Sequence, residues 1–273
     1  MMNLEENVER YGDSYFTKTH TNEAQRLKML AQTFDPMTRL QLKTRGLPWG
    51  GRCLDVGAGN GSISVWLSEQ AELATGQIFA LDRDVRGLKE LTEQHSNIQV
   101  IEHDLTTTMP DNLIGKFDLI HARFVLMHLP ERIIVLERLI SCLKPGGVIM
   151  ISDSIDFNLE TTSTSPYRKV MDACYSMLNV TFGLDIQWSR SMPHHFRQAG
   201  LQAIGAEVYF PSLDALSPAA RFWKLTWDQI YDQMVRQNYI DAVTLAQAER
   251  AFIDSNYWEL SAGMLTAWGR RSL

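Results

Sequence analysis

The sequence is poor in cysteine. It has three among 273 residues, namely Cys53, Cys142 and Cys174, and no two of them form a CxxC pair. An odd and widely spaced set of this kind supplies neither a disulfide framework nor a zinc site. We therefore expect a protein that holds no metal and no structural disulfide.

Long apolar runs are also lacking. No stretch approaches the ~20 consecutive apolar residues that cross a bilayer. The first six residues are acidic and contain no apolar run, whereas a signal peptide has a basic start followed by an apolar segment. These two absences predict a soluble, cytoplasmic protein.

Basic residues are in deficit. Lys and Arg number 26 against 32 Asp and Glu, which gives a net charge of −6. Proteins that bind nucleic acid usually carry a basic patch or a basic balance, so we expect no nucleic-acid partner. The hydrophobic content of 45% is typical of a globular protein with a sizeable buried core.

Between residues 51 and 154, short apolar segments alternate with amphipathic ones. The apolar segments predict strands at residues 52–56, 77–81, 98–101, 117–121 and 148–152. The intervening segments predict helices at residues 62–70, at 85–94, and from Pro130 onward with an apolar stripe at Ile133, Leu136, Ile140 and Leu143. Strands that alternate with helices in this way form βαβ units. The fold class is therefore α/β, a doubly wound and mostly parallel sheet with helices on both faces.

The flanking segments are expected to be mostly helical. Before residue 51, one helix begins at Thr21 or Asn22, and Asp35-Pro36 restarts a second that ends at Gly46. After residue 154 the expected elements are a loop at 160–166, helices near 167–175, at 194–199 and over 218–257 with a break near Tyr239, and strands at 203–210 and 264–269. We therefore divide one domain into a helical segment (1–50), a ligand-binding core (51–154), and helical cap insertions with the last two strands (155–273).

A glycine-rich turn follows the first expected strand and opens a helix. Its backbone contacts to a ligand would come from Gly57, Ala58, Gly59 and Gly61. Such a turn alone is weak evidence for a ligand. However, Ser62 stands where a dinucleotide motif has its last glycine, and Asp55 precedes the turn. A carboxylate there repels a pyrophosphate and attracts an ammonium group, so the turn favours a ligand with an amino group.

Carboxylates close the next two strands. Asp82 lies about 20 residues past the turn, where an acidic residue accepts hydrogen bonds from ribose hydroxyls. It could also cap the helix that follows. Asp104-Leu105 ends the third strand and could accept from an amino group such as that of adenine, or serve only as a turn. Arg83 would suit a 2′-phosphate, but the carboxylate beside it would repel that phosphate.

These residues together resemble the class I S-adenosylmethionine-dependent methyltransferase superfamily. The resemblance rests on five elements in order: residues 55–61, Asp82, 104–105, 117–123 and 143–147. It is strongest to the branch of ubiquinone, menaquinone and natural-product small-molecule methyltransferases. It implies a seven-stranded sheet of order 3-2-1-4-5-7-6 with the seventh strand antiparallel. The chain departs from the family by a long insertion between the last two strands.

The resemblance implies S-adenosylmethionine as the cofactor. The expected cofactor-binding residues are Asp55, Gly57, Ala58, Gly59, Gly61, Asp82, Arg83, Asp104, Leu105, Ala122 and Arg123. Arg123 lies at the end of the fourth strand and could contact the cofactor carboxylate, an acidic substrate or only a surface glutamate.

The function that follows is methyl transfer to a small molecule in secondary or cofactor metabolism, and a homodimer is compatible with it. If the acceptor is a hydroxyl, a base is needed, and the candidates are His128, His194, His195 and Asp153. His128 could equally be a buried structural residue. The alternatives are a cofactor-binding protein that acts as a non-methylating cyclase, and an NAD(P)-dependent oxidoreductase. The aromatic-rich set of the cap is expected mainly to form core, with a few members in the pocket: Tyr167, Met171, Tyr175, Trp188, Trp223 and Trp227.

Overall fold

The computed structural model describes residues 10–156 and 165–273. A loop is expected at residues 160–166, and residues 160–164 of it lie outside the described part of the chain. No helix in the described part of the chain is long and apolar enough to span a membrane.

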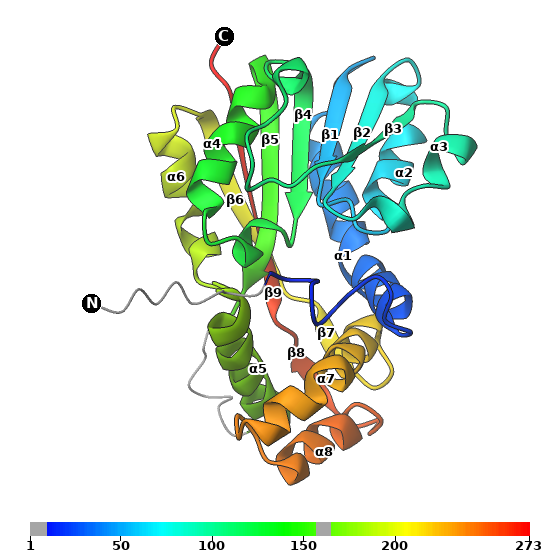
Figure 1. The fold of residues 1–273 in the computed structure, drawn as a ribbon, viewed down its shortest axis with the longest axis vertical. Coiled ribbons are helices and arrows are strands. Elements are labelled where there is room, and N and C mark those ends of the chain that lie inside the picture. The colour runs from blue at the N-terminus through cyan, green and yellow to red at the C-terminus, as the bar shows by residue number, and fades with distance from the viewer. Residues whose placement is uncertain (1–9, 157–164) are drawn as a thin grey trace.

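A seven-stranded sheet forms the upper half of the molecule (Figure 1). Its strands are β1 (Arg52–Val56), β2 (Gln77–Asp82), β3 (Ile98–Glu102), β4 (Phe117–Arg123), β5 (Leu143–Ile155), β6 (Gln202–Tyr209) and β9 (Gly263–Arg270). The order across the sheet is β3-β2-β1-β4-β5-β9-β6, and β9 runs antiparallel to the other six strands. The expected fold class, strand order and antiparallel last strand are confirmed.

Helices cover both faces of the sheet. They are α1 (Glu23–Arg45), α2 (Ser62–Ser68), α3 (Leu91–Gln94), α4 (Arg132–Cys142) and α6 (Met192–Gln198). Neighbouring side chains of β1 show the two-sided burial, since Cys53 packs in one hydrophobic cluster with Leu42 of α1, and Leu54 packs in the other with Leu136 of α4. Strand side chains alternate between faces, so a strand buried on both sides reads as a continuous apolar run.

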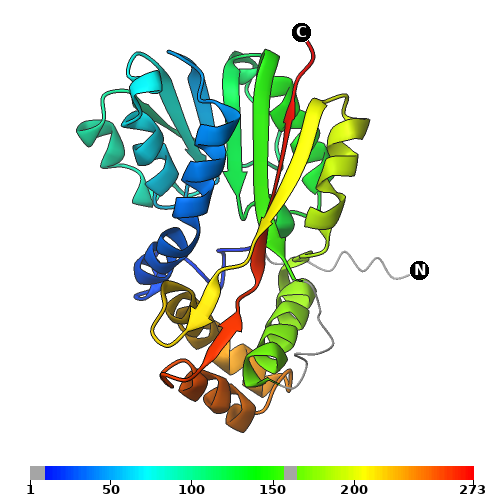
Figure 2. The same ribbon diagram turned by 180° about the vertical axis from the view of Figure 1, so that it is seen from behind.

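A second, mostly helical lobe lies beyond the carboxyl edge of the sheet. It contains α5 (Pro166–Phe182), α7 (Pro218–Arg236), α8 (Ala242–Ala251) and a two-stranded ribbon of β7 (Ser212–Asp214) and β8 (Trp258–Leu260). Figure 2 shows β6 and β9 leading side by side out of the sheet into this ribbon. The insertion expected between the last two strands therefore builds the lobe apart from α5, which precedes β6. Strands of three residues are too short for the pattern to reveal, and the ribbon was not expected.

The two helices expected before residue 51 are a single helix. Pro36 lies inside α1, which runs on to Gly46, a residue with φ +84° that ends it as expected. A proline inside a helix removes one backbone hydrogen bond. Here α1 packs along α7 and α2, and the buried Asp35 beside the proline binds Arg123 of β4. These tertiary contacts outweigh the local signal for a break.

Two further helix expectations were only partly right. Residues 85–94 form a short 3-10 turn, Val85–Gly87, and then the single turn of α3. Gly87 packs against the glycine-rich turn, since a Cβ on it would lie 3.3 Å from the Gly59 oxygen. Because the segment packs along this turn, it does not form a regular helix. On α4, Ile133 is exposed, because the buried face runs through Val135, Leu136 and Leu139. The remaining 3-10 turns among the described residues are Ala71–Leu73, Asp111–Leu113, Leu126–His128 and Trp188–Ser191.

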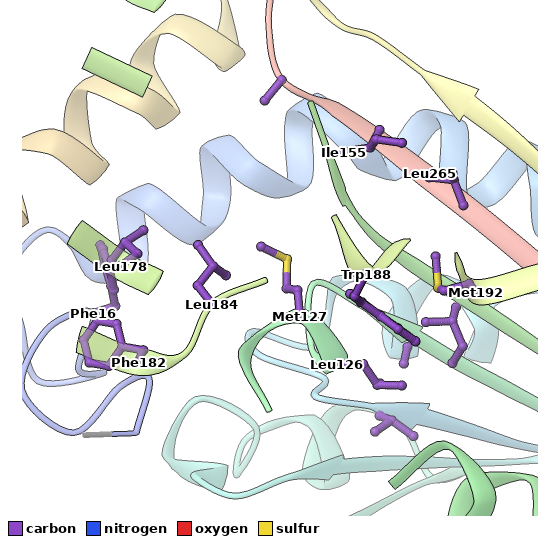
Figure 3. Packing of buried hydrophobic residues seen from close by; sticks show 14 of the residues in the cluster. Phe16, Leu126, Met127, Ile155, Leu178, Phe182, Leu184, Trp188, Met192 and Leu265 are labelled. Carbon is purple, nitrogen blue, oxygen red and sulfur yellow. The ribbon is translucent and has the colours of Figure 1, made fainter. Parts of the chain in front are cut away.

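The residues before α1 cross from the sheet half to the helical lobe. We call residues 10–20 the N-terminal segment. Phe16 in this segment is buried against Leu178 and Phe182 of α5, as Figure 3 shows. The segment is thus held by apolar burial as well as by the polar contacts described next.

Candidate active site

A cavity of about 1130 Å³ lies where the carboxyl edge of the sheet meets the helical lobe. Ordinary ligand pockets occupy ~300–1,000 Å³, so this one is larger than an ordinary pocket for a single ligand. One end is lined by the glycine-rich turn and the ends of β2 and β3, and we call it the cofactor end. The other end is lined by α1, α5, α7 and the N-terminal segment, and we call it the acceptor chamber.

The three glycines of the turn have different structural roles. Gly57, Gly59 and Gly61 all have positive φ, between +62° and +76°. A Cβ on Gly57 would lie 2.3 Å from the Val125 side chain, and a Cβ on Gly61 would lie 2.3 Å from that of Leu91. A Cβ on Gly59 would meet nothing closer than 3.9 Å. Gly59 therefore faces the open cavity, whereas Gly61 is required for packing and does not line it.

Asp82 and Asp104 both line the cofactor end. The Asp82 carboxylate accepts hydrogen bonds from the backbone N–H groups of Gly59 at 2.8 Å and Asp84 at 2.9 Å. It therefore fixes the glycine-rich turn against the end of β2. The cap of the following 3-10 turn is Asp84, whose side chain accepts from the Arg86 N–H. The capping role considered for Asp82 therefore belongs to Asp84.

The Asp104 carboxylate is held ionised. Burial raises its pKa, but hydrogen bonds from the Thr106 backbone and hydroxyl and from the Arg10 guanidinium outweigh burial, and the pKa is lower than usual. Leu105 beside it is buried and also lines the cavity. A carboxylate in this state can accept a hydrogen bond from an exocyclic amino group.

Asp55 is paired within the protein. Its two oxygens lie 2.8 Å from His121 Nδ1 and 2.6 Å from the Ser64 hydroxyl, which donates to it, and all three side chains are buried. The other ring nitrogen of His121, Nε2, is buried without a hydrogen-bond partner, and His121 lines the cavity. The sequence reasoning did not select His121, although it lies within the fourth-strand motif.

Both arginines considered for ligand contacts have partners within the protein. Arg123 lines the cavity, but its guanidinium donates to Asp35 at 2.7 Å and to Thr38 at 2.9 Å, both on α1. Arg83 donates to the Tyr11 carbonyl and to Asp13 of the N-terminal segment. Both arginines therefore tie the sheet to other parts of the chain. Ala122, between the motif residues of β4, is fully buried and does not line the cavity.

Of the four candidate bases, His128 is the one that lines the cavity. Burial lowers the pKa of His128 to about 3, assisted by the positive charges of Arg26 and Arg132. The ring is therefore neutral at physiological pH, and its Nδ1 is buried without a hydrogen-bond partner. The same ring stacks on that of Tyr11.

Asp153 has a structural position. It is fully buried at the end of β5 and accepts from the backbone N–H groups of Val125 and Met127 and from the Trp188 indole, at 2.8–3.1 Å. Burial raises its pKa to about 7, although these three hydrogen bonds act in the opposite direction. Asp153 thus fixes the loop that carries His128.

His194 and His195 lie on α6, which does not line the cavity.

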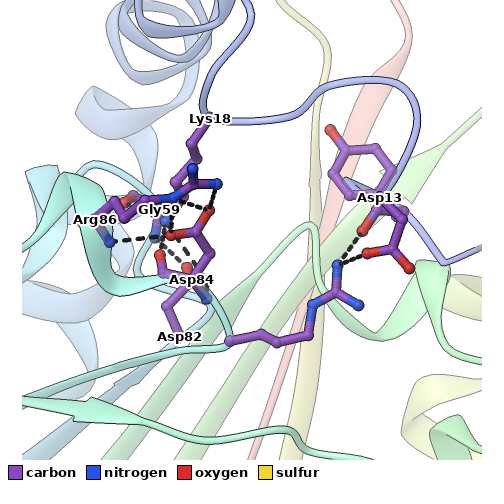
Figure 4. A network of polar contacts seen from close by, with 8 residues as sticks. Asp13, Lys18, Gly59, Asp82, Asp84 and Arg86 are labelled. Atoms are coloured by element: carbon purple, nitrogen blue, oxygen red, sulfur yellow. Dashed lines mark hydrogen bonds and ion pairs between the residues drawn. The ribbon is translucent and has the colours of Figure 1, made fainter.

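The N-terminal segment closes over the cofactor end. The Lys18 ammonium donates to the carbonyl oxygens of Gly59 and Asp84 and lies 3.6 Å from Asp82 (Figure 4). These contacts join residues far apart in the sequence, and no local pattern marks them.

Within the aromatic-rich set of the cap, Tyr175 and Trp223 line the cavity, while the other four members are buried elsewhere in the core.

Comparison with known proteins gives the family. A family model described as a methyltransferase domain matches residues 28–206. A grayanic acid biosynthesis cluster O-methyltransferase from Cladonia grayi is 32% identical over 136 residues, which are 46% of this chain and 29% of that protein. A ubiquinone biosynthesis O-methyltransferase from Haemophilus ducreyi is 31% identical over 125 residues, 41% of this chain and 49% of that protein.

Among solved structures, a Bacillus halodurans protein described as a methyltransferase superposes with a TM-score of 0.59 at 14% identity, covering 88% of this chain and all of that one. A likeness at that identity concerns the fold alone. The Cladonia grayi and Haemophilus ducreyi proteins are matched over less than half of their own length. Since the family model covers well over half of the chain, the chain belongs to the methyltransferase domain family.

Proposed function

We propose that this protein transfers a methyl group from S-adenosylmethionine to a small-molecule acceptor, in secondary or quinone metabolism. The observation that carries the proposal is the meeting of Asp82, Asp104 and the exposed face of Gly59 in one cavity at the carboxyl edge of the sheet. Ligands of doubly wound α/β proteins bind at this edge.

The cofactor end fits an adenosyl amino acid in three respects. Gly59 leaves open the space that a Cβ would fill. Asp82 uses one hydrogen bond at each oxygen, and each retains lone-pair capacity for a ribose hydroxyl. His121 Nε2 is a buried polar atom without a partner, and such atoms usually find one. Asp82 would hold the ribose, Asp104 the adenine amino group, and the turn with His121 the amino-acid part.

When bound, S-adenosylmethionine supplies a methyl group on a positively charged sulfur, and the products are the methylated acceptor, S-adenosylhomocysteine and a proton. The protein aligns the acceptor and keeps water out. His128 is positioned to accept a hydrogen bond from an acceptor hydroxyl. With a pKa of about 3 it is a weak proton acceptor, so we assign it to orienting the acceptor instead of deprotonating it.

The experiment that tests the proposal is calorimetric titration with S-adenosylhomocysteine. Asp82→Ala should weaken binding by about 100-fold, since it removes hydrogen bonds made by a charged acceptor. Asp118→Ala is the matched control, because Asp118 lies at the amino end of β4, where it binds the Arg52 N–H and Lys144. Equal affinities of the two variants would contradict the assignment.

Neither alternative function is favoured, because the matching family is that of methyltransferases. The three cysteines are free and buried, which is consistent with the reducing cytoplasm, and we propose a cytoplasmic location. The homodimer remains a prediction, and light scattering would measure the oligomeric state.

A further inference from the structure

The acceptor chamber is largely apolar and aromatic. Its side chains include Phe16, Leu30, Phe34, Met127, Tyr175 and Trp223. Flat ring systems pack well against such rings, face to face or edge to face. The shape and chemistry of the lining therefore suit a ring compound, and the charges in the chamber decide which kind.

Two oppositely charged side chains of α1 line the chamber. Glu23 and Arg26 are both at least 96% buried, since their side chains are 3% and 4% exposed. The Arg26 guanidinium donates to both carboxylate oxygens of Glu23, at 2.7 and 2.8 Å. Gln229 of α7 also donates to Glu23, at 3.0 Å. The two charges neutralise each other inside the protein.

Arg26 has little of its surface left for a ligand. Its guanidinium carbon lies 4.6 Å from the centre of the Phe16 ring and 5.5 Å from that of Phe222. It also donates to the Tyr11 hydroxyl at 2.8 Å. An acidic ligand would have to displace Glu23 or these rings in order to reach it.

The other ionisable groups around the chamber are also neutral, paired or exposed. His128 is uncharged at physiological pH. Arg123 binds Asp35, and Asp55 binds His121. Glu131 lies at the solvent-exposed rim. Among the described residues that line the chamber, no buried charge lacks a partner.

We propose that the acceptor is an uncharged ring compound, and that Glu23 maintains this selectivity by neutralising the charge of Arg26. The proposal rests on the proposed function and names the substrate class of the same site. An ionised acceptor would be buried without a counter-charge from the protein, which is strongly unfavourable. A neutral ring with one hydrogen-bonding group meets no such cost.

The test compares three probes with the same bicyclic ring: 2-naphthol, 2-naphthoate and 2-naphthylmethylammonium. Each is titrated calorimetrically into protein saturated with S-adenosylhomocysteine at pH 7.5. Naphthol should bind at least tenfold more tightly than either ion. The proposal is overturned if an ion binds as tightly as naphthol, or if naphthol fails to bind while S-adenosylhomocysteine binds.

Two variants test whether Glu23 must neutralise Arg26 for the preference to hold. Glu23→Gln leaves Arg26 with an uncompensated charge, so naphthoate should gain at least tenfold in affinity relative to naphthol. The double variant Glu23→Gln/Arg26→Met removes both charges and should keep the wild-type preference. If naphthoate gains nothing in folded Glu23→Gln protein, neutralisation of Arg26 by Glu23 does not maintain the selectivity. The wild-type series decides the substrate class even if a variant fails to fold.

These outcomes are separate from a failure of the proposed function. If wild-type protein does not bind S-adenosylhomocysteine, the cofactor assignment is wrong. If it does bind and the charged probes still match naphthol, only the substrate class is wrong.

Discussion

The ring of Tyr11 stacks on the ring of His128, with the two centroids 3.9 Å apart and the planes inclined by 26°. Tyr11 belongs to the N-terminal segment and His128 to the loop after β4. The Tyr11 hydroxyl also accepts a hydrogen bond from Arg26 of α1. Its ring also lies edge-on to that of Phe182 of α5, so one side chain joins the N-terminal segment, the sheet, α1 and the helical lobe around the cavity.

Removal of the Tyr11 ring should loosen this closure. Stacked aromatic pairs contribute ~0.5–1.5 kcal/mol beyond their burial, so Tyr11→Ala should speed the dissociation of S-adenosylhomocysteine roughly tenfold in stopped-flow experiments. Tyr11→Phe keeps the stack and loses only the hydroxyl, and it should dissociate at nearly the wild-type rate. If both variants release the ligand equally fast, the hydroxyl and not the stacking holds the segment.

The glycines at 57 and 59 should respond differently to alanine. Gly57→Ala places a methyl group 2.3 Å from Val125, so the free energy of unfolding should fall by about 2 kcal/mol or more. Gly59→Ala meets no side chain and should lose only about 1 kcal/mol for its positive φ, but its methyl group enters the cavity and should weaken S-adenosylhomocysteine at least tenfold. Urea unfolding and calorimetry measure the two effects. A Gly59→Ala protein that binds normally would place the ligand elsewhere.

The sheet could be predicted because its signals are local. Apolar runs separated by segments of helical periodicity predicted all seven strands. Gly57, Asp82 and Asp104 lie at the ends of parallel strands, and a parallel sheet brings these ends to one edge. The helix break expected at Asp35-Pro36 was wrong, since long-range packing of α1 overrides the proline.

The closure of the cavity could not be predicted, because its contacts join distant residues of ordinary type. Lys18 meets Gly59, and Tyr11 meets His128, with no motif around either partner in the N-terminal segment. Arg123 was expected at a ligand or a surface group, and its partner Asp35 on α1 is visible only in the fold. Sequence spacing identifies the edge of the sheet at which a ligand binds. It does not show which side chains at that edge are already paired with other residues.

The buried, neutral His128 should make the protein sensitive to acid. Its pKa of about 3 in the folded state is lower than the ordinary value of 6.5, so the unfolded chain binds the proton more readily. The stability due to a neutral His128 is therefore fully present above pH 6.5 and is lost as the pH falls toward 3. We expect the loss to be about 1 kcal/mol per pH unit, relative to His128→Phe, which keeps an aromatic ring against Tyr11.

Urea unfolding of both proteins at pH 7.5, 6 and 5 measures this difference. The raised pKa of Asp153 gives the opposite slope, with stability lost as the pH rises toward about 7, but Asp153 is present in both proteins and cancels. A constant difference in unfolding free energy across this range would show that His128 titrates normally.

The buried pair of Arg123 and Asp35 should be important for stability. Their side chains are 10% and 7% exposed, and the pair joins β4 to α1 at the glycine-rich edge. Asp35→Asn leaves the Arg123 charge buried without a counter-charge, so the free energy of unfolding should fall by about 3 kcal/mol. Arg39→Ala removes the more exposed partner of the same carboxylate, since the Arg39 side chain is 42% exposed, and it should cost less than about 1 kcal/mol. Equal losses in urea unfolding would mean that the pair contributes no more than a surface contact, and that packing alone keeps α1 continuous through Pro36.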